Sequence, residues 1–282
     1  MGLLKCGRFW ERVHSGEPTL CDGALGSELI RQGVPSALTV DANLDFPVNV
    51  DALYQGYIAA GAQIISTNTF GLAEGQNWEE GVLGGVSIAM RAARENASEI
   101  GVWLSLSSDS LRKRLKWLAA ASRDVLDWPE MLLIETCSSL LGVRQAVADA
   151  ASIRHNVLVV TAHFGADGRM LDGTSPEEFA STLVRHGVHV IGANCGHEPE
   201  QFIEVVDRMR STTTTPLLIQ PSAGLPALSP AGQWEYPVDP GRFASVMRKI
   251  AEHGANFIGG CCGTSCVHIS AVRDQLASFD LH

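Results

Sequence analysis

Short apolar runs alternate with longer amphipathic stretches along almost the whole chain. The short runs are rich in β-branched residues, which is typical of buried strands, and the longer ones have the spacing of helices. Repeated strand-helix units indicate a parallel sheet covered by helices. We identify eight candidate strands: 19–24, 63–68, 101–107, 131–136, 156–162, 188–195, 216–221 and 256–262.

Two of the intervening helices have clear starting signals. Ser175 and Pro176 precede one of them, and Asp239 and Pro240 precede another, which places a capping side chain and a first-turn proline at each start. Eight such units favour an α/β fold of the closed (β/α)8 TIM barrel type. A doubly wound open sheet is the alternative, although no glycine-rich dinucleotide loop follows the first strand.

Composition agrees with one compact domain over residues 1–282. The 282 residues are 45% hydrophobic and 18% charged, which is ample material for a core. No linker, repeat or low-complexity tract divides the chain. The formal net charge of −10 argues against binding to nucleic acid or to anionic lipid, and leaves a small molecule or a protein as the expected partner.

The N-terminal segment and the absence of a long apolar run indicate the compartment, in which the cysteines are then interpreted. No apolar run approaches the roughly 18 residues of a membrane span, and charged residues interrupt the first 18 positions, so we expect a cytoplasmic protein. In a reducing compartment, seven cysteines are expected to include metal-binding or catalytic thiols together with ordinary buried cysteines.

Polar residues collect where the candidate strands end. In a parallel barrel these ends form the mouth, where the chemistry of such barrels takes place. The residues at the ends are Asp22, Gly23, Thr67, Asn68, Thr69, 105–109, Glu135, Thr136, Cys137, His163, Asn194, Cys195, Gly196, Pro221, Ser222, Cys261 and Cys262.

Three cysteines end the sixth and eighth strands. Cys261 and Cys262 are adjacent, so a disulfide between them would be strained and would tie no distant segments together. With Cys195 they offer three thiolates at one point, which suits a soft tetrahedral cation, usually zinc, and leaves its fourth position open. The glycines at 259, 260 and 263 would let both neighbours face the metal. The alternative is that these thiols are small buried hydrophobes.

Six motifs stand out along the chain: DGALGSEL at 22–29, STNTFG at 66–71, IET at 134–136, GTS at 173–175, GANCG at 192–196 and GGCCGT at 259–264. In order and in spacing, from about residue 19 to residue 278, they resemble the homocysteine S-methyltransferase family. This family includes the homocysteine-binding module of cobalamin-dependent methionine synthase and the betaine- and S-methylmethionine-dependent enzymes.

The resemblance implies a (β/α)8 barrel with one zinc ion held by Cys195, Cys261 and Cys262. It also implies a pocket for L-homocysteine. Asp22 and Glu135 would hold the amino group, and backbone amides near Gly23 and Ala24 would receive the carboxylate. Asn194 and the turn of Thr67, Asn68 and Thr69 would shape the same pocket.

Some of these residues have simpler interpretations. Asp22 could cap the helix that follows it, whereas Glu135 ends an apolar run and needs a partner if it is buried. His163 and His197 lie near the mouth and are expected to make local hydrogen bonds. For Cys137 and Cys266 we expect packing roles.

The methyl donor is the open question. The third candidate strand ends in LSLSSDS where relatives usually carry a Ser-x-Gly-Pro-like sequence, and only a short segment separates it from the fourth. The loop after Phe70 and Gly71 is also short, and Pro221-Ser222-Ala223-Gly224 replaces the common Pro-Asn-Ala-Gly.

Short loops predict a wide mouth, which suits methyl transfer from a separate methylated corrinoid protein. No cobalamin- or folate-binding module is expected within the chain itself. A free donor, such as S-methylmethionine, S-adenosylmethionine or betaine, is the alternative. A barrel that binds zinc and a thiol without turnover is a third possibility.

Overall fold

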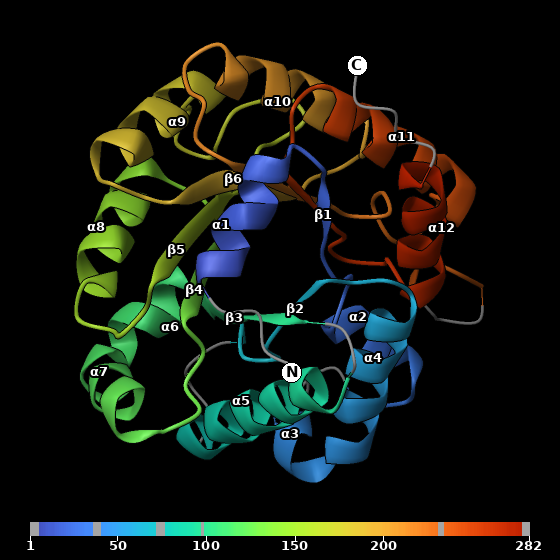
Figure 1. Ribbon diagram of the computed structural model, residues 1–282. Coiled ribbons are helices and arrows are strands. Elements are labelled where there is room, and N and C mark those ends of the chain that lie inside the picture. Colours follow the sequence, from blue (N-terminus) through green and yellow to red (C-terminus); the bar gives the residue numbers. More distant parts are fainter. Residues whose placement is uncertain (1–5, 36–40, 72–76, 97–98, 231–233, 278–282) are drawn as a thin grey trace.

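The computed structural model describes residues 6–35, 41–71, 77–96, 99–230 and 234–277, with the side chains of residues 6–8 outside that description. Eight parallel strands form its centre, and helices surround them in a ring (Figure 1). The strands are β1 (Thr19–Leu20), β2 (Ile64–Ser66), β3 (Gly101–Ser107), β4 (Met131–Cys137), β5 (Val157–Ala162), β6 (Val190–Cys195), β7 (Leu217–Pro221) and β10 (Phe257–Ile258).

The order of the strands shows that the sheet is a barrel. Neighbours follow β1-β10-β7-β6-β5-β4-β3-β2, and a parallel bridge between Cys21 and Ile64 joins the two ends. All eight expected strands are present, and the expected (β/α)8 barrel is confirmed. The open-sheet alternative is wrong, because the first and last members of the sheet meet.

Most of the helices lie outside the barrel and connect consecutive strands (Figure 1). They are α2 (Gly26–Arg31), α3 (Ala42–Asp45), α4 (Pro47–Ala59), α5 (Trp78–Glu95), α6 (Ser108–Lys113), α7 (Leu115–Asp124), α8 (Leu140–Ala150), α9 (Pro176–Arg185), α10 (Gln201–Arg210), α11 (Pro240–Glu252) and α12 (Cys266–Leu276). No helix among the described residues is long and apolar enough to cross a membrane.

The two expected helix starts are confirmed. Ser175 is the N-cap of α9, and its hydroxyl accepts a hydrogen bond from the amide of Glu178. Asp239 caps α11 by accepting hydrogen bonds from the amides of Gly241 and Arg242. Each cap satisfies amide groups that have no partner within the helix.

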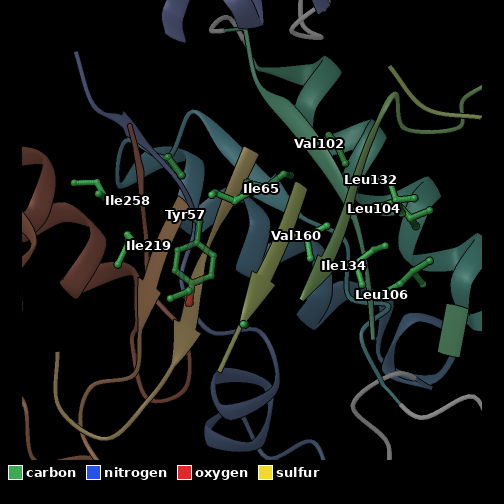
Figure 2. Packing of buried hydrophobic residues seen from close by; sticks show 14 of the residues in the cluster. Tyr57, Ile65, Val102, Leu104, Leu106, Leu132, Ile134, Val160, Ile219 and Ile258 are labelled. Carbon is green, nitrogen blue, oxygen red and sulfur yellow. The ribbon is translucent and has the colours of Figure 1, made fainter. Parts of the chain in front are cut away.

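Apolar residues on the outward face of the strands form the main core with the helices. Figure 2 shows part of this layer, in which Tyr57 of α4 lies among aliphatic side chains that include Ile219 and Ile258. Close strand contacts require small residues at certain points. A Cβ atom on Gly192 of β6 would lie 1.8 Å from the carbonyl oxygen of Leu218 on β7, so only glycine fits there.

A helix that the sequence did not lead us to expect, α1 (Cys6–Ser15), crosses the middle of the ring of helices (Figure 1). Phe9 is buried in a cluster of residues from inside the barrel, and its ring stacks on that of Phe257 with centroids 5.2 Å apart. Trp10 and Val13 pack against the same cluster. The helix therefore closes the end of the barrel opposite the carboxyl ends of the strands.

Two further differences concern the segments near the mouth. A short antiparallel pair, β8 (Ala227–Leu228) and β9 (Trp234–Glu235), follows β7 and was not expected. The last strand, expected over 256–262, is regular only over Phe257–Ile258, although the amides of Gly259 and Cys261 still donate to the carbonyls of Ile219 and Pro221. Cys262 and Gly263 form the turn that follows.

Candidate functional site

A cavity of about 210 Å³ lies at the carboxyl ends of the strands. Its walls come from the ends of seven of the eight barrel strands and the turns after them, which is where (β/α)8 enzymes carry their active sites. The cavity brings together every predicted metal-binding and substrate-binding residue, namely Asp22, Gly23, Ala24, Thr67, Asn68, Glu135, Asn194, Cys195, Cys261 and Cys262.

The three predicted thiols converge at one side of this cavity. The Sγ atoms of Cys195 and Cys261 are 2.9 Å apart, and those of Cys261 and Cys262 are 3.9 Å apart. All three Sγ atoms lie within 4.8 Å of one another. Tetrahedral zinc with Zn–S bonds of about 2.3 Å separates its sulfur ligands by about 3.8 Å. The spacing of Cys261 and Cys262 matches this value, whereas the Sγ atoms of Cys195 and Cys261 would have to move apart to hold the ion. The set of three thiols suits a soft tetrahedral cation.

Unusual backbone conformations aim these thiols into the cavity. Cys195 has a φ of +65°, in the left-handed region that non-glycine residues seldom adopt. Gly263, just after the cysteine pair, has a φ of +79°. A Cβ atom on Gly263 would lie 2.1 Å from the ring of Tyr236, so the aromatic ring packs directly on this turn.

The thiols influence one another. The neighbouring thiols Cys195 and Cys261 lower the pKa of Cys262, whereas the pKa of Cys261 is raised by Cys195 and Cys262 and by burial. This arrangement favours the thiolate, the form in which cysteine binds metals, at Cys262.

Asp22 lines the same cavity and is almost fully buried, with 1% of its surface exposed. Its carboxylate accepts hydrogen bonds from the amide of Ser66 (2.7 Å) and from the Ser66 hydroxyl (3.2 Å). Helix α2 begins after Leu25 and has no side-chain cap, so the capping interpretation of Asp22 is wrong. Burial, the largest cause, raises the pKa of Asp22 to about 7; the hydrogen bonds from Ser66 oppose this rise and the nearby Glu135 adds to it.

Glu135 reaches the cavity because β4 is irregular near its end. The register between β4 and β5 shifts between Ile134 and Cys137, and Thr136 has a φ of +58°. Irregularities of this kind redirect a side chain near a strand end. The Ser105 hydroxyl donates to one carboxylate oxygen of Glu135, and burial raises the pKa of Glu135 to about 7.

Asn194 holds several of these groups together through its buried carboxamide. Its oxygen accepts hydrogen bonds from the Thr136 amide (3.0 Å) and the Thr161 hydroxyl (2.8 Å). Its nitrogen lies 2.7 Å from the Thr136 hydroxyl, 3.3 Å from a Glu135 oxygen and 3.7 Å from the Cys195 Sγ. Asn194 therefore lines the cavity and also fixes the strained turns that carry Glu135 and Cys195.

The turn after β1 is held from outside the cavity. The amide of Ala24 donates to the Thr264 hydroxyl (3.0 Å), so this amide already has a partner inside the protein. The expectation that the Ala24 amide receives a substrate carboxylate is therefore not supported by this geometry, although Ala24 lines the cavity. Among the described residues, no hydrogen bond is found for the Gly23 amide, which remains a candidate.

Thr67 and Asn68 form a wall that is held by the protein itself. The Thr67 hydroxyl accepts a hydrogen bond from the Ser105 amide (3.0 Å) and pairs with that of Thr69 (2.6 Å). Asn68 exchanges hydrogen bonds with Asn43, and its amide donates to the Tyr54 hydroxyl (2.8 Å). These contacts keep the turn after β2 in a fixed shape.

The remaining polar candidates lie outside the cavity lining. His163 accepts a long hydrogen bond from the Gly196 amide (3.4 Å), and its ring centroid is 6.5 Å from that of His197. Burial lowers the pKa of His163. Cys137 is buried in the main core, and Cys266 packs against it from the start of α12. The hydrogen-bonding role expected for His163 and the packing roles expected for Cys137 and Cys266 agree with these contacts, whereas the role of the His197 side chain stays a prediction.

Some residues of the site were identified from the sequence without a role. Ser105 was listed among the strand ends, and Ser66 and Thr264 belong to two of the motifs. Gln220 was not singled out; a polar side chain inside the otherwise apolar β7 was the available signal, and it lines the cavity together with Ser66 and Ser105. The side chain of Thr264 is buried behind the cavity wall.

A barrel with this cavity belongs to the class of (β/α)8 enzymes that act on small molecules at the carboxyl ends of their strands. The sequence profile of one family, described as homocysteine S-methyltransferase, matches residues 19–276. The chain therefore belongs to the homocysteine S-methyltransferase family, whose members are methyltransferases.

Similar proteins divide into two groups. Methionine synthase of Mycobacterium tuberculosis is 30% identical over 297 residues, which cover 91% of this chain and 24% of that protein. An S-methylmethionine–homocysteine S-methyltransferase of Pongo abelii is 26% identical over 296 residues, which cover 95% of this chain and 80% of that protein. The chain thus spans about a quarter of the length of the methionine synthases it matches.

The fold has a close counterpart among solved structures. The homocysteine methyltransferase MmuM of Escherichia coli superposes with a TM-score of 0.74 at 19% identity, covering 92% of this chain and 96% of that one. Its metallated form gives a TM-score of 0.73. At this identity the similarity establishes the shared barrel.

Proposed function

We propose that this chain transfers a methyl group to the sulfur of L-homocysteine and forms methionine, with zinc held by Cys195, Cys261 and Cys262. One observation carries the proposal. The same cavity is lined by three convergent thiols and by two carboxyl groups, those of the buried Asp22 and the half-buried Glu135. A substrate with a thiol at one end and an ammonium group at the other matches both.

The carboxyl groups provide the recognition of the amino end. Burial raises the pKa of both Asp22 and Glu135 to about 7, so each is held partly protonated near neutral pH. An ammonium group between them favours their ionised forms, because an opposite charge lowers the pKa of a carboxyl group. The buried ion pair is then hydrogen-bonded by Ser66 and Ser105.

The thiols provide the site for the sulfur end. Zinc bound there would lower the pKa of a coordinated thiol, so that the substrate sulfur is deprotonated at neutral pH. Asn194 contacts both Cys195 and Glu135 through its side-chain nitrogen, and so keeps the positions of these two residues fixed relative to each other.

The reaction is a displacement at carbon. A lone pair on the homocysteine sulfur forms the new bond to the methyl carbon, while the bond between that carbon and the donor breaks and its electrons leave with the donor. The thiol proton is lost before this step, so no protein side chain needs to remove it during transfer. The cavity therefore has to position the donor carbon opposite the sulfur.

We propose a methylated corrinoid protein as the donor, on the basis of the open mouth. Helix α6 follows β3 directly, so no long insertion covers the cavity on that side. The segments around the mouth carry exposed apolar side chains, including Phe70 (42% exposed), Leu228 (61%) and Trp234 (63%). Exposed apolar groups of this kind are typical of surfaces that meet another macromolecule.

The donor is tested by a panel assay. Purified protein loaded with zinc is incubated with L-homocysteine and, separately, methylcobalamin, S-methylmethionine, S-adenosylmethionine or betaine, and methionine is measured. Methylcobalamin stands in for the corrinoid protein and is expected to be the most effective donor. Efficient methylation by a free donor would refute the corrinoid proposal alone. Zinc binding without turnover for any donor would refute the methyltransferase proposal and favour a non-catalytic thiol-binding barrel.

A further inference from the structure

We propose that Thr264 and Tyr57 are positioning residues that fix the distance between the amino-acid end and the sulfur end of the cavity, and so select homocysteine over the shorter thiol cysteine. This inference rests on the proposed function. It concerns two side chains that lie behind the cavity wall and touch neither end of the substrate directly.

Thr264 connects two neighbouring turns that both line the cavity. Its hydroxyl accepts a hydrogen bond from the amide of Ala24 (3.0 Å) and donates one to the carbonyl of Cys261 (2.7 Å). The side chain is fully buried. One hydroxyl group thus joins the turn beside Asp22 to the turn that carries two of the three thiols.

Two glycines show how closely the turns enclose Thr264. A Cβ atom on Gly260 would lie 2.2 Å from its Oγ1 atom, and a Cβ atom on Gly23 would lie 2.8 Å from the same atom. Both distances are shorter than real contacts allow, so glycine is required at both positions. Thr264 is held between the two turns and has no room to shift.

Tyr57 supports the same junction from helix α4. Its buried hydroxyl donates to the carbonyl of Ala24 (2.7 Å) and lies 3.3 Å from the carbonyl of Thr264. The ring belongs to the rigid outer core, where Figure 2 shows it among the aliphatic side chains. Tyr57 therefore anchors the junction to the helix layer.

Two further contacts make the turns a single unit. The amide of Gly260 donates to the carbonyl of Asp22 (2.9 Å), and the amide of Gly263 donates to the Ser27 hydroxyl (3.0 Å). With the contacts of Thr264 and Tyr57, these bonds join the segment at 22–27 to the segment at 260–264 at several points. The separation between the carboxyl group of Asp22 and the cysteine pair is thereby fixed by buried groups.

A fixed separation discriminates between thiol amino acids by length. Cysteine is one methylene shorter than homocysteine, so it cannot reach the thiol side while its ammonium group remains with Asp22 and Glu135. One methylene is worth roughly 10- to 200-fold in discrimination where the surrounding site does not adapt. A cavity whose two turns could move would adapt, and its discrimination would fall.

The test compares variants that keep or remove the two hydroxyl groups. Thr264→Val preserves the shape of the side chain and removes its hydrogen bonds, Thr264→Ser keeps the hydroxyl, and Tyr57→Phe removes the support from α4. Thr182→Val, a buried threonine of α9, is the matched control for the substitution itself. For each variant, kcat/KM for homocysteine and for cysteine, bound zinc and the melting temperature are measured.

We expect Thr264→Val and Tyr57→Phe to lower the homocysteine-to-cysteine ratio of kcat/KM about tenfold with zinc still bound, since losing a buried hydrogen bond is commonly worth that much. Thr264→Ser and Thr182→Val should leave the ratio unchanged. An equal loss of activity on both substrates, or an unchanged ratio in folded Thr264→Val and Tyr57→Phe, would overturn the inference.

Binding measurements separate this inference from the proposed function. Isothermal titration of the zinc-loaded protein gives the ratio of dissociation constants for homocysteine and cysteine without any turnover. If the wild type binds both thiols but methylates neither, the methyltransferase proposal fails, and the change in the binding ratio still decides the role of Thr264 and Tyr57. If the wild type binds neither thiol, both are refuted.

Discussion

Replacing Asp22 with asparagine should stabilise the ligand-free protein above neutral pH. Asp22 is buried, and its pKa in the folded protein is raised from 3.8 to about 7, chiefly by that burial. In the unfolded chain the group is exposed and ionises near its ordinary pKa. The folded state therefore holds a proton that the unfolded state releases.

The sign of the effect follows from this difference. A group whose pKa is raised on folding contributes stability that is fully present below pH 3.8 and is lost as the pH rises through about 7. The difference between the pKa values of Asp22 in the unfolded and folded states corresponds to roughly 4 kcal/mol, at 1.36 kcal/mol per pH unit. Between pH 5 and pH 8 roughly 2.5 kcal/mol of it is lost. Asparagine has no proton to lose and keeps an oxygen that can accept from Ser66.

The measurement is urea unfolding of the wild type and of Asp22→Asn at several values between pH 5 and pH 8, with the same zinc content. The free energy of unfolding of the variant, relative to the wild type, should increase by about 2 to 3 kcal/mol across this range. The same variant should lose homocysteine binding, since a neutral amide cannot balance the ammonium group. Parallel stability curves for the two proteins would refute the assignment of a raised pKa to Asp22.

Four other substitutions have definite expected outcomes. Cys262→Ala should abolish both zinc retention and methionine formation, whereas Cys6→Ser in α1 should change neither. Metal analysis and the activity assay measure these effects, and zinc retained by Cys262→Ala would contradict the proposed ligand set. Gly192→Ala should destabilise the fold by about 3 kcal/mol or more, because its new methyl group would collide with the Leu218 carbonyl; a near-normal melting temperature would show that the strands can separate at no cost. Phe9→Ala should lower the free energy of unfolding by about 3 to 5 kcal/mol in urea titrations. The zinc content per folded chain should stay the same, and a loss of zinc would show that α1 affects the site.

The barrel was predictable because its signals are local. The runs ending at Ser107 and Cys137 are apolar enough to mark β3 and β4 almost to the residue. Helix α1 was missed because its apolar residues, Phe9, Trp10 and Val13, acquire a partner only once the strands have assembled. The pair β8 and β9 was missed because strands of two residues leave no period to detect.

The candidate site was predictable for residues whose chemistry is unusual at a strand end. Adjacent cysteines and a carboxylate after an apolar run both require explanation, and both line the cavity. The hydrogen bonds that hold the site residues in place could not be predicted from the sequence. Whether the Ala24 amide is free depends on the Thr264 hydroxyl, which comes from the other end of the barrel sequence. Likewise, the left-handed conformation of Cys195 depends on partners brought together by folding.

The stacking of Phe9 on Phe257 has a consequence for the order of folding. The two rings come from the first helix and the last barrel strand, so their contact spans nearly the whole described chain. Closing so long a loop is entropically expensive, and contacts of this kind slow folding when they are needed early. We therefore expect α1 to pack against the barrel only after β10 has joined the sheet. Folding would then end at the face away from the cavity, when α1 packs against the completed barrel.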